Sequence, residues 1–144
     1  MFATALLCAG TLLFAADPAV APRQETPSGE SRLELLAIEQ NIIAFTNYER
    51  ARYGQPLLEV DPELMDSARQ HTVWMTVNQS MVHSRQPVAE NIAMGQRDSE
   101  EVVQSWMHST GHRANILNSS NHRIGVAAYR TASGTIFWCQ QFRR

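Results

Sequence analysis

The side chains best suited to chemistry in this 144-residue chain are its five histidines: His71, His83, His108, His112 and His122. His108 and His112 have the spacing at which two side chains share one helix face, as in a zinc-binding pair. However, Gly111 favours an interrupted helix between them, and no glutamate follows His108 as it does in a metalloprotease helix. The support for this pair is therefore weak, and we expect His71, His108 and His122 to be structural or exposed residues.

His83 and Glu90 form a more promising combination. Both lie in a polar, turn-rich segment from 81 to 94 that apolar residues bound on either side, and functional side chains are often carried by loops on a rigid scaffold. The imidazole and the carboxylate can hold a divalent ion or act as an acid–base pair. They can also simply hydrogen-bond one another and pin the loop, and the residues alone leave these alternatives open.

Composition excludes several classes of partner. The formal net charge is −2, and the twelve basic residues are all arginines scattered along the chain. We therefore expect no nucleic-acid surface, which needs a basic face, and no polybasic membrane patch. The two cysteines are Cys8 and Cys139, and Cys139 lies in an apolar run, which favours a buried, inert thiol.

The N-terminal region differs from the rest of the chain. An uncharged apolar run from Phe2 to Ala16 is too short to span a bilayer comfortably and fits the core of a secretory signal peptide. We interpret residues 1–21 as a signal peptide or apolar leader and residues 22–31 as a linker. The remaining residues, 32–144, are enough for one folded domain, and the expected location is secreted, periplasmic or at the cell envelope, without a stable transmembrane span.

Periodicity and capping residues predict the helices. Apolar residues at helical spacing indicate a first helix, with Ser31 and Glu34 as its capping box. Asp61 followed by Pro62 is a strong start for a second helix, and Asp98 has the features of a third cap. The expected helices are 32–53, 61–78 and 98–109, followed by a short helical turn at 112–117.

The C-terminal part changes to β-prone runs. Strands are expected at 89–94, 124–129 and 135–142, with a hairpin turn at 131–134. Helices followed by antiparallel strands predict the α+β class. Trp74, Trp106 and Trp138 are expected in the core or in the wall of a cleft.

Several of these segments resemble bacterial domains of the CAP superfamily. The matching segments are NYER at 47–50, AENIA at 89–93, EVVQSWMHSTGHRANIL at 101–117, IGVA at 124–127 and WCQQF at 138–142. The superfamily, also called SCP, includes cysteine-rich secretory proteins, antigen 5 and pathogenesis-related plant proteins. The resemblance covers about residues 33 to 142, and its tryptophan-to-leucine signature at 106–117 is long and specific.

This resemblance implies an α-β-α sandwich with a central antiparallel sheet and a cleft lined by histidine and acidic residues. The family's first histidine falls on His83, its first glutamate on Glu90 and its second histidine on His112. Where many eukaryotic members carry a second glutamate, this chain has Ser109, which puts a four-ligand metal site in doubt. His83 and His112 are therefore the expected metal ligands, and His83, Glu90 and His112 the candidates for any catalysis. No cofactor is expected to be required, although zinc or another divalent cation can be bound.

Three hypotheses for function remain. The first is a secreted or envelope-associated domain whose His/Glu cleft binds a small ligand, a lipid or a divalent ion. The second is a hydrolase that uses a metal ion or the His/Glu pair, although no serine or cysteine is placed by sequence next to a base. The third is a structural interaction module, with a protein partner and no functional cleft. Fold alone does not decide between them.

Overall fold

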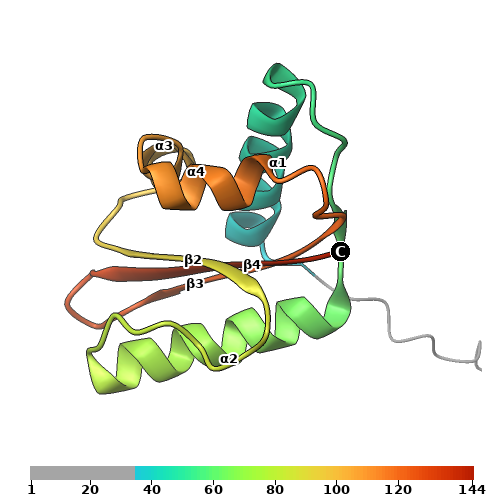
Figure 1. Cartoon of the computed structure of the whole chain (residues 1–144). Helices are drawn as coiled ribbons and strands as arrows, with labels where there is room; N and C mark the ends of the chain where they lie inside the picture. The colour runs from blue at the N-terminus through green and yellow to red at the C-terminus, as the bar shows by residue number, and fades with distance from the viewer. Residues whose placement is uncertain (1–34) are drawn as a thin grey trace, which may run out of the picture. The chain divides into compact units, whose positions relative to one another are not determined.

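The computed structural model describes residues 35–144, so the leader, the linker and the Ser31–Glu34 capping box lie outside the described residues. Figure 1 shows helices on both sides of one sheet. The elements in chain order are α1 (Ala37–Arg52), β1 (Glu59–Val60), α2 (Pro62–Asn78), β2 (Ala89–Met94), α3 (Ser99–Met107), α4 (Thr110–Leu117), β3 (Arg123–Arg130) and β4 (Ile136–Arg143).

The layers are those of the expected α-β-α sandwich. Helices α1, α3 and α4 cover one face of the sheet, and α2 covers the other (Figure 1). The strand order is β1-β3-β4-β2, and both β3 and β2 pair with β4 in antiparallel orientation. The two-residue strand β1 pairs with β3 in parallel, so the sheet is mixed, with an antiparallel body as predicted.

The buried strand β4 separates two hydrophobic clusters. Trp138 and Phe142 belong to the larger cluster, which includes residues of α1, α3 and α4. Phe137 and Cys139 belong to a smaller cluster with Ala68 and other residues. Successive side chains of a strand point to opposite faces, so a continuous apolar run serves both layers. Cys139 is fully buried, as predicted.

Local capping defines two of the helix starts. The Asp61 carboxylate accepts hydrogen bonds from the Glu63 and Leu64 amides at 2.9 and 3.2 Å, and Pro62 occupies the first helical position. Asp98 accepts from the Glu101 amide at 2.9 Å. Both predicted starts are confirmed, because a cap of this kind depends only on neighbouring residues.

Helix α1 begins later than predicted. It starts at Ala37 rather than at Arg32, and Leu36 occupies the cap position with an extended backbone. The Glu39 carboxylate accepts from the Leu36 amide at 2.9 Å and also binds Arg69 of α2 at 2.6 Å. The described part of the first helix is therefore fixed partly by a long-range ion pair, which apolar periodicity does not reveal.

A close approach of α2 to the sheet depends on Gly125 in β3. A Cβ atom at this position would lie 2.1 Å from the backbone carbon of Leu64. The helix backbone therefore packs directly on the strand, and only glycine leaves room for it. No helix within residues 35–144 is long and apolar enough to cross a membrane.

Candidate functional site

The candidate site lies where the segment between α2 and β2 folds back over the sheet. Glu90 is the second residue of β2, and its side chain is only 5 % exposed. One carboxylate oxygen, Oε1, accepts from Nδ1 of His83 and from the Ser84 amide, each at 2.8 Å. The other oxygen, Oε2, accepts from Nε2 of Gln141 at 2.8 Å. One buried carboxylate thus anchors the loop to the sheet.

These contacts determine the protonation of Glu90. Burial alone raises the pKa of a carboxyl group, but hydrogen bonds from Gln141, Ser84 and His83 together lower the pKa of Glu90 below its ordinary value. Beneath it, the Cys139 thiol lies 3.8 Å from Oε2. Burial and the charge of Glu90 raise the pKa of Cys139 well above its ordinary value. Glu90 is therefore a fixed anion at neutral pH, and Cys139 is a protonated, inaccessible thiol.

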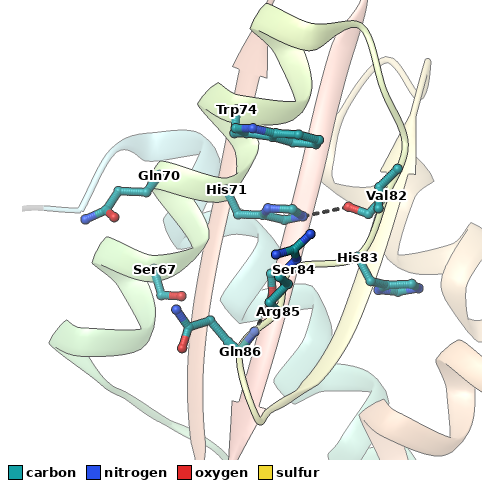
Figure 2. A pocket seen from close by; sticks show the side chains of 9 residues that line it. All are labelled: Ser67, Gln70, His71, Trp74, Val82, His83, Ser84, Arg85 and Gln86. Atoms are coloured by element: carbon teal, nitrogen blue, oxygen red, sulfur yellow. Dashed lines mark hydrogen bonds between the residues drawn. The ribbon is translucent and has the colours of Figure 1, made fainter.

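His83 presents its other nitrogen to solvent. Its side chain is 60 % exposed, and Figure 2 shows its ring on the far side of the loop from α2. Because the ionised carboxylate of Glu90 can only accept hydrogen bonds, the bond at Nδ1 requires the proton to be on Nδ1. In the neutral form of the ring, Nε2 then carries a free lone pair on the accessible side.

His112 lies in the first turn of α4 and is half-buried. Burial and the neighbouring charge of His83 lower the pKa of His112, so this imidazole is neutral at physiological pH. Asn115, one turn further along α4, donates to the Glu90 carbonyl at 3.2 Å and to Asn91 Oδ1 at 2.9 Å. Asn115 therefore ties α4, the helix that carries His112, to β2, the strand that carries Glu90.

Arg50 and Asn115 belong to one polar network that passes through a third residue, Asn121. Arg50 is fully buried and donates to the carbonyls of Ile116, Asn118 and Asn121. Asn121 in turn donates to the Asn115 carbonyl at 3.0 Å. The guanidinium thus satisfies carbonyls at the C-terminal end of α4, and it supports the helix that carries His112.

The other histidines differ in their surroundings. His108 is exposed, and its Nδ1 pairs with the Gln104 carbonyl at 2.7 Å, so it lies away from His83 as expected. His71 has a larger role than the pattern indicated: its side chain is 10 % exposed, and its Nε2 pairs with the Val82 carbonyl at 2.8 Å. Nε2 is also 4.0 Å from Glu90 Oε1. His71 therefore holds the loop against α2.

The donor set for a metal ion is small. Glu90 already accepts three hydrogen bonds from nitrogen donors, which leaves His83 and His112 as available ligands. No group of three or more His, Cys, Asp or Glu side chains in the described part of the chain is arranged to hold an ion. Closed zinc sites have about four protein ligands, so the residues present suit only an open, weaker site that water or another ligand completes.

A pocket of about 560 Å³ lies between α2 and the loop, and we call it the α2 pocket. Figure 2 shows His71 and Trp74 one above the other on α2, facing the loop. The two rings are parallel within 8° and their centroids are 6.0 Å apart. Trp74 is thus a cleft-wall residue, whereas Trp106 and Trp138 are buried in the core. The pocket is lined by Ser67, Gln70, His71, Trp74, Val82, His83, Ser84, Arg85 and Gln86.

Known proteins share both the sequence and this architecture. The chain is 34% identical over 142 aligned residues to the uncharacterized protein YkwD of Bacillus subtilis, covering 87% of this chain and 54% of YkwD. A solved extracellular protein containing a SCP domain, from Bacillus anthracis, is 31% identical with a TM-score of 0.66. That match covers 74% of this chain and 40% of the other. The chain thus spans about half of YkwD and less of the second protein.

A more distant structure shows the same fold. An outer surface protein from Borrelia burgdorferi has a TM-score of 0.65 at 19% identity, covering 73% of this chain and 91% of that one. The model of the CAP family, described as the cysteine-rich secretory protein family, matches residues 43–142. Because that match spans well over half of the sequence and all of the sheet except Arg143, this protein belongs to the CAP, or cysteine-rich secretory protein, family.

Proposed function

We propose that this CAP domain acts outside the cytoplasm as a binding module, and that the site formed by His83, Glu90 and His112 binds a divalent cation or a small ligand. The observation that carries the proposal is the state of Glu90. Its buried carboxylate is occupied by hydrogen bonds from the loop and the sheet, so it orients His83 instead of reacting.

The two imidazoles supply the binding chemistry. The bond from His83 Nδ1 to Glu90 leaves Nε2 as a lone-pair donor, which is the carboxylate–histidine arrangement found behind many metal ligands. The lowered pKa of His112 favours the neutral form of that ring. Neutral imidazole nitrogens are good ligands for Zn²⁺ and similar cations. A bound cation would supply positive charge with which an anionic or carbonyl group of a second ligand could interact.

The same contacts speak against hydrolysis by the side chains alone. A general base should have a pKa near the working pH, whereas hydrogen bonding lowers the pKa of Glu90. A cysteine nucleophile needs an accessible thiolate, whereas Cys139 is buried with a raised pKa. These features favour ligand binding over an acid–base or cysteine hydrolase.

Two observations support a location outside the cytoplasm. The apolar leader at 1–21 fits a secretory signal, and the Bacillus anthracis protein with 31% identity is described as extracellular. Secretion or attachment to the cell envelope would both satisfy the proposal. Fractionation of cells that express the full chain, with detection of the CAP domain in each fraction, tests this part.

The site itself can be tested by titrating the full chain with Zn²⁺ and measuring the heat of binding by calorimetry. We expect one saturable site whose affinity falls at least about tenfold in His83→Ala and in His112→Ala, because each variant loses a ligand. Glu90→Gln should weaken binding by roughly ten- to a hundredfold through loss of ring orientation. His108→Ala is the matched control, since His108 is exposed and pairs only with the Gln104 carbonyl.

Melting temperatures of the same variants distinguish binding from structure. If the cluster is a structural module, His83→Ala and His112→Ala should lower the melting temperature without changing any Zn²⁺ response. Zn²⁺ affinity that stays unchanged in both variants would remove these residues as a metal site.

A further inference from the structure

We propose that the α2 pocket is a saccharide site, in which a sugar ring stacks on Trp74 and a carboxylate of the sugar pairs with Arg85. This site shares His83 with the proposed cation site, but the rest of its wall is formed by α2 and the loop and not by α4. The α2 pocket has a volume of about 560 Å³, within the range of about 300–1,000 Å³ that is typical for small-molecule sites.

Trp74 supplies a flat, preorganised platform. Its side chain is 46 % exposed, although tryptophan is usually well buried. The His71 ring stacks parallel to it, and His71 is itself fixed by its hydrogen bond to the Val82 carbonyl. The indole is therefore held in one orientation before any ligand arrives. The C–H face of a sugar ring can pack on the part of the indole that His71 leaves free, and little conformational entropy is lost.

The rest of the wall offers hydrogen bonds of the kind that hydroxyl groups need. The side chains of Ser67, Gln70 and Gln86 line the α2 pocket and make no hydrogen bond to any residue from 35 to 144. An amide side chain presents both donors and an acceptor, so it can satisfy a hydroxyl group that donates and accepts. Figure 2 shows Ser67 and Gln86 near one another between α2 and the loop, and Gln70 on the outer side of α2.

The charge of the pocket selects an acidic sugar. Arg85 is the arginine in the wall, and no aspartate or glutamate among residues 35–144 lines the pocket. Arg85 is exposed and has no acidic partner in that range. A guanidinium binds a carboxylate through two parallel hydrogen bonds. A carboxylated saccharide therefore uses the wall better than a neutral one.

Two other classes of ligand fit less well. A lipid tail requires an extended apolar lining, whereas Trp74 and Val82 are the two apolar residues among the nine that line the pocket. An extended peptide commonly adds to a free strand edge. On β2, however, the Glu90 carbonyl accepts a hydrogen bond from the Asn115 side chain, and the Ile92 carbonyl accepts one from the Trp106 side chain. The combination of one aromatic plane, free amides and one cation is that of a sugar site.

The proposal is tested by incubating the labelled full chain on a glycan array that contains uronic-acid, muramic-acid and neutral saccharides. Calorimetry with the best-bound oligosaccharide then gives the affinity. We expect binding of carboxylated glycans and a loss of roughly tenfold or more in Trp74→Ala, which removes the stacking surface. Arg85→Gln should weaken binding of the acidic glycan and not that of its carboxyl-reduced form.

Matched controls are available among other exposed residues. Val77→Ala removes another exposed apolar side chain of α2, 76 % exposed, that is not in the pocket wall. Arg130→Gln removes an exposed arginine in β3. Both should bind like the unmodified chain, and Zn²⁺ affinity should be unchanged in Trp74→Ala.

Several results would overturn the proposal. They are the absence of any retained glycan, full binding by Trp74→Ala, or equal affinity for acidic and carboxyl-reduced saccharides. Retention on phosphatidylglycerol vesicles that is lost in both Trp74→Ala and Val77→Ala would instead identify this face of α2 as a membrane-contacting surface. Because Zn²⁺ binding is measured separately, failure here leaves the proposed function untouched.

Discussion

Replacing Glu90 tests whether this carboxylate holds the loop and the sheet together. In Glu90→Ala, the Ser84 amide and Gln141 Nε2 lose their acceptor, whereas His83 can turn to water because its side chain is 60 % exposed. An unsatisfied buried donor costs about 1–3 kcal/mol, and Ser84 is only half-buried. We therefore expect a loss of about 2–4 kcal/mol in the free energy of unfolding.

Glu90→Gln should be milder because Gln141 can adapt. The remaining carbonyl oxygen can accept from the loop, while the new amide nitrogen would face Gln141 Nε2. The buried Oε1 of Gln141 accepts no hydrogen bond from residues 35–144, so Gln141 can turn its amide group without breaking a bond at that oxygen. Oε1 of Gln141 then accepts a hydrogen bond from the new amide nitrogen at position 90. The variant loses mainly the charge assistance of the bonds, and we expect it to be about 1–2 kcal/mol less stable than the unmodified chain.

The assay is denaturant unfolding of the three proteins across pH 3–7 in steps of about one unit. The folded-state pKa of Glu90 is lowered from its ordinary value of 4.5, so its ionised form contributes stability above that pH. This contribution is lost as the pH falls through the folded-state pKa. The difference in the free energy of unfolding between the unmodified chain and Glu90→Gln should therefore become smaller in acid. A difference that becomes larger in acid, or a glutamine variant as unstable as the alanine variant, would refute the reasoning.

Two further predictions concern the scaffold. In Gly125→Ala, the added Cβ would lie 2.1 Å from the Leu64 backbone carbon, so α2 must move. Thermal denaturation should show a loss of about 3 kcal/mol in the free energy of unfolding. A loss below about 1 kcal/mol would contradict this packing. Arg50→Met should cost about 3–5 kcal/mol in denaturant unfolding, because buried carbonyls of Ile116 and Asn121 lose a charged donor. Arg50→Lys should recover only part of that loss, since one ammonium group cannot reproduce the diverging bonds of a guanidinium.

The sequence predicts β2, β3, β4 and the later helices well because their signals are local, whereas the two-residue strand β1 is not predicted. Asp61 and Asp98 cap helices through amides only two or three residues away, and the predicted strand at 89–94 has the bounds of β2. The start of α1 is different. There the Glu39 carboxylate contacts both the Leu36 amide and Arg69 on another helix, and no pattern within one helix contains that contact.

The candidate site likewise contains contacts that the local sequence indicated and contacts that it could not indicate. The link between His83 and Glu90 spans seven residues of one loop, and their residue types already indicated a hydrogen bond that pins the loop as one alternative. The roles of His71 and Trp74 depend on the loop folding back over α2, with Val82 reaching His71 across eleven residues. Helical periodicity indicates that these side chains lie close together on one helix, but it does not indicate which residues pack against them.

The loop can serve two different faces because its consecutive residues are held from opposite sides. His71 on α2 binds the Val82 carbonyl, and Glu90 on β2 binds the Ser84 amide and the His83 ring. Neighbouring side chains of an extended chain point in opposite directions. Val82 and His83 both line the α2 pocket, and the His83 ring lies on the side of the loop away from α2 (Figure 2). Neither anchor depends on apolar packing of the loop itself, whose Val82 and His83 are exposed. The buried groups of α2 and the sheet therefore determine the geometry of both proposed sites.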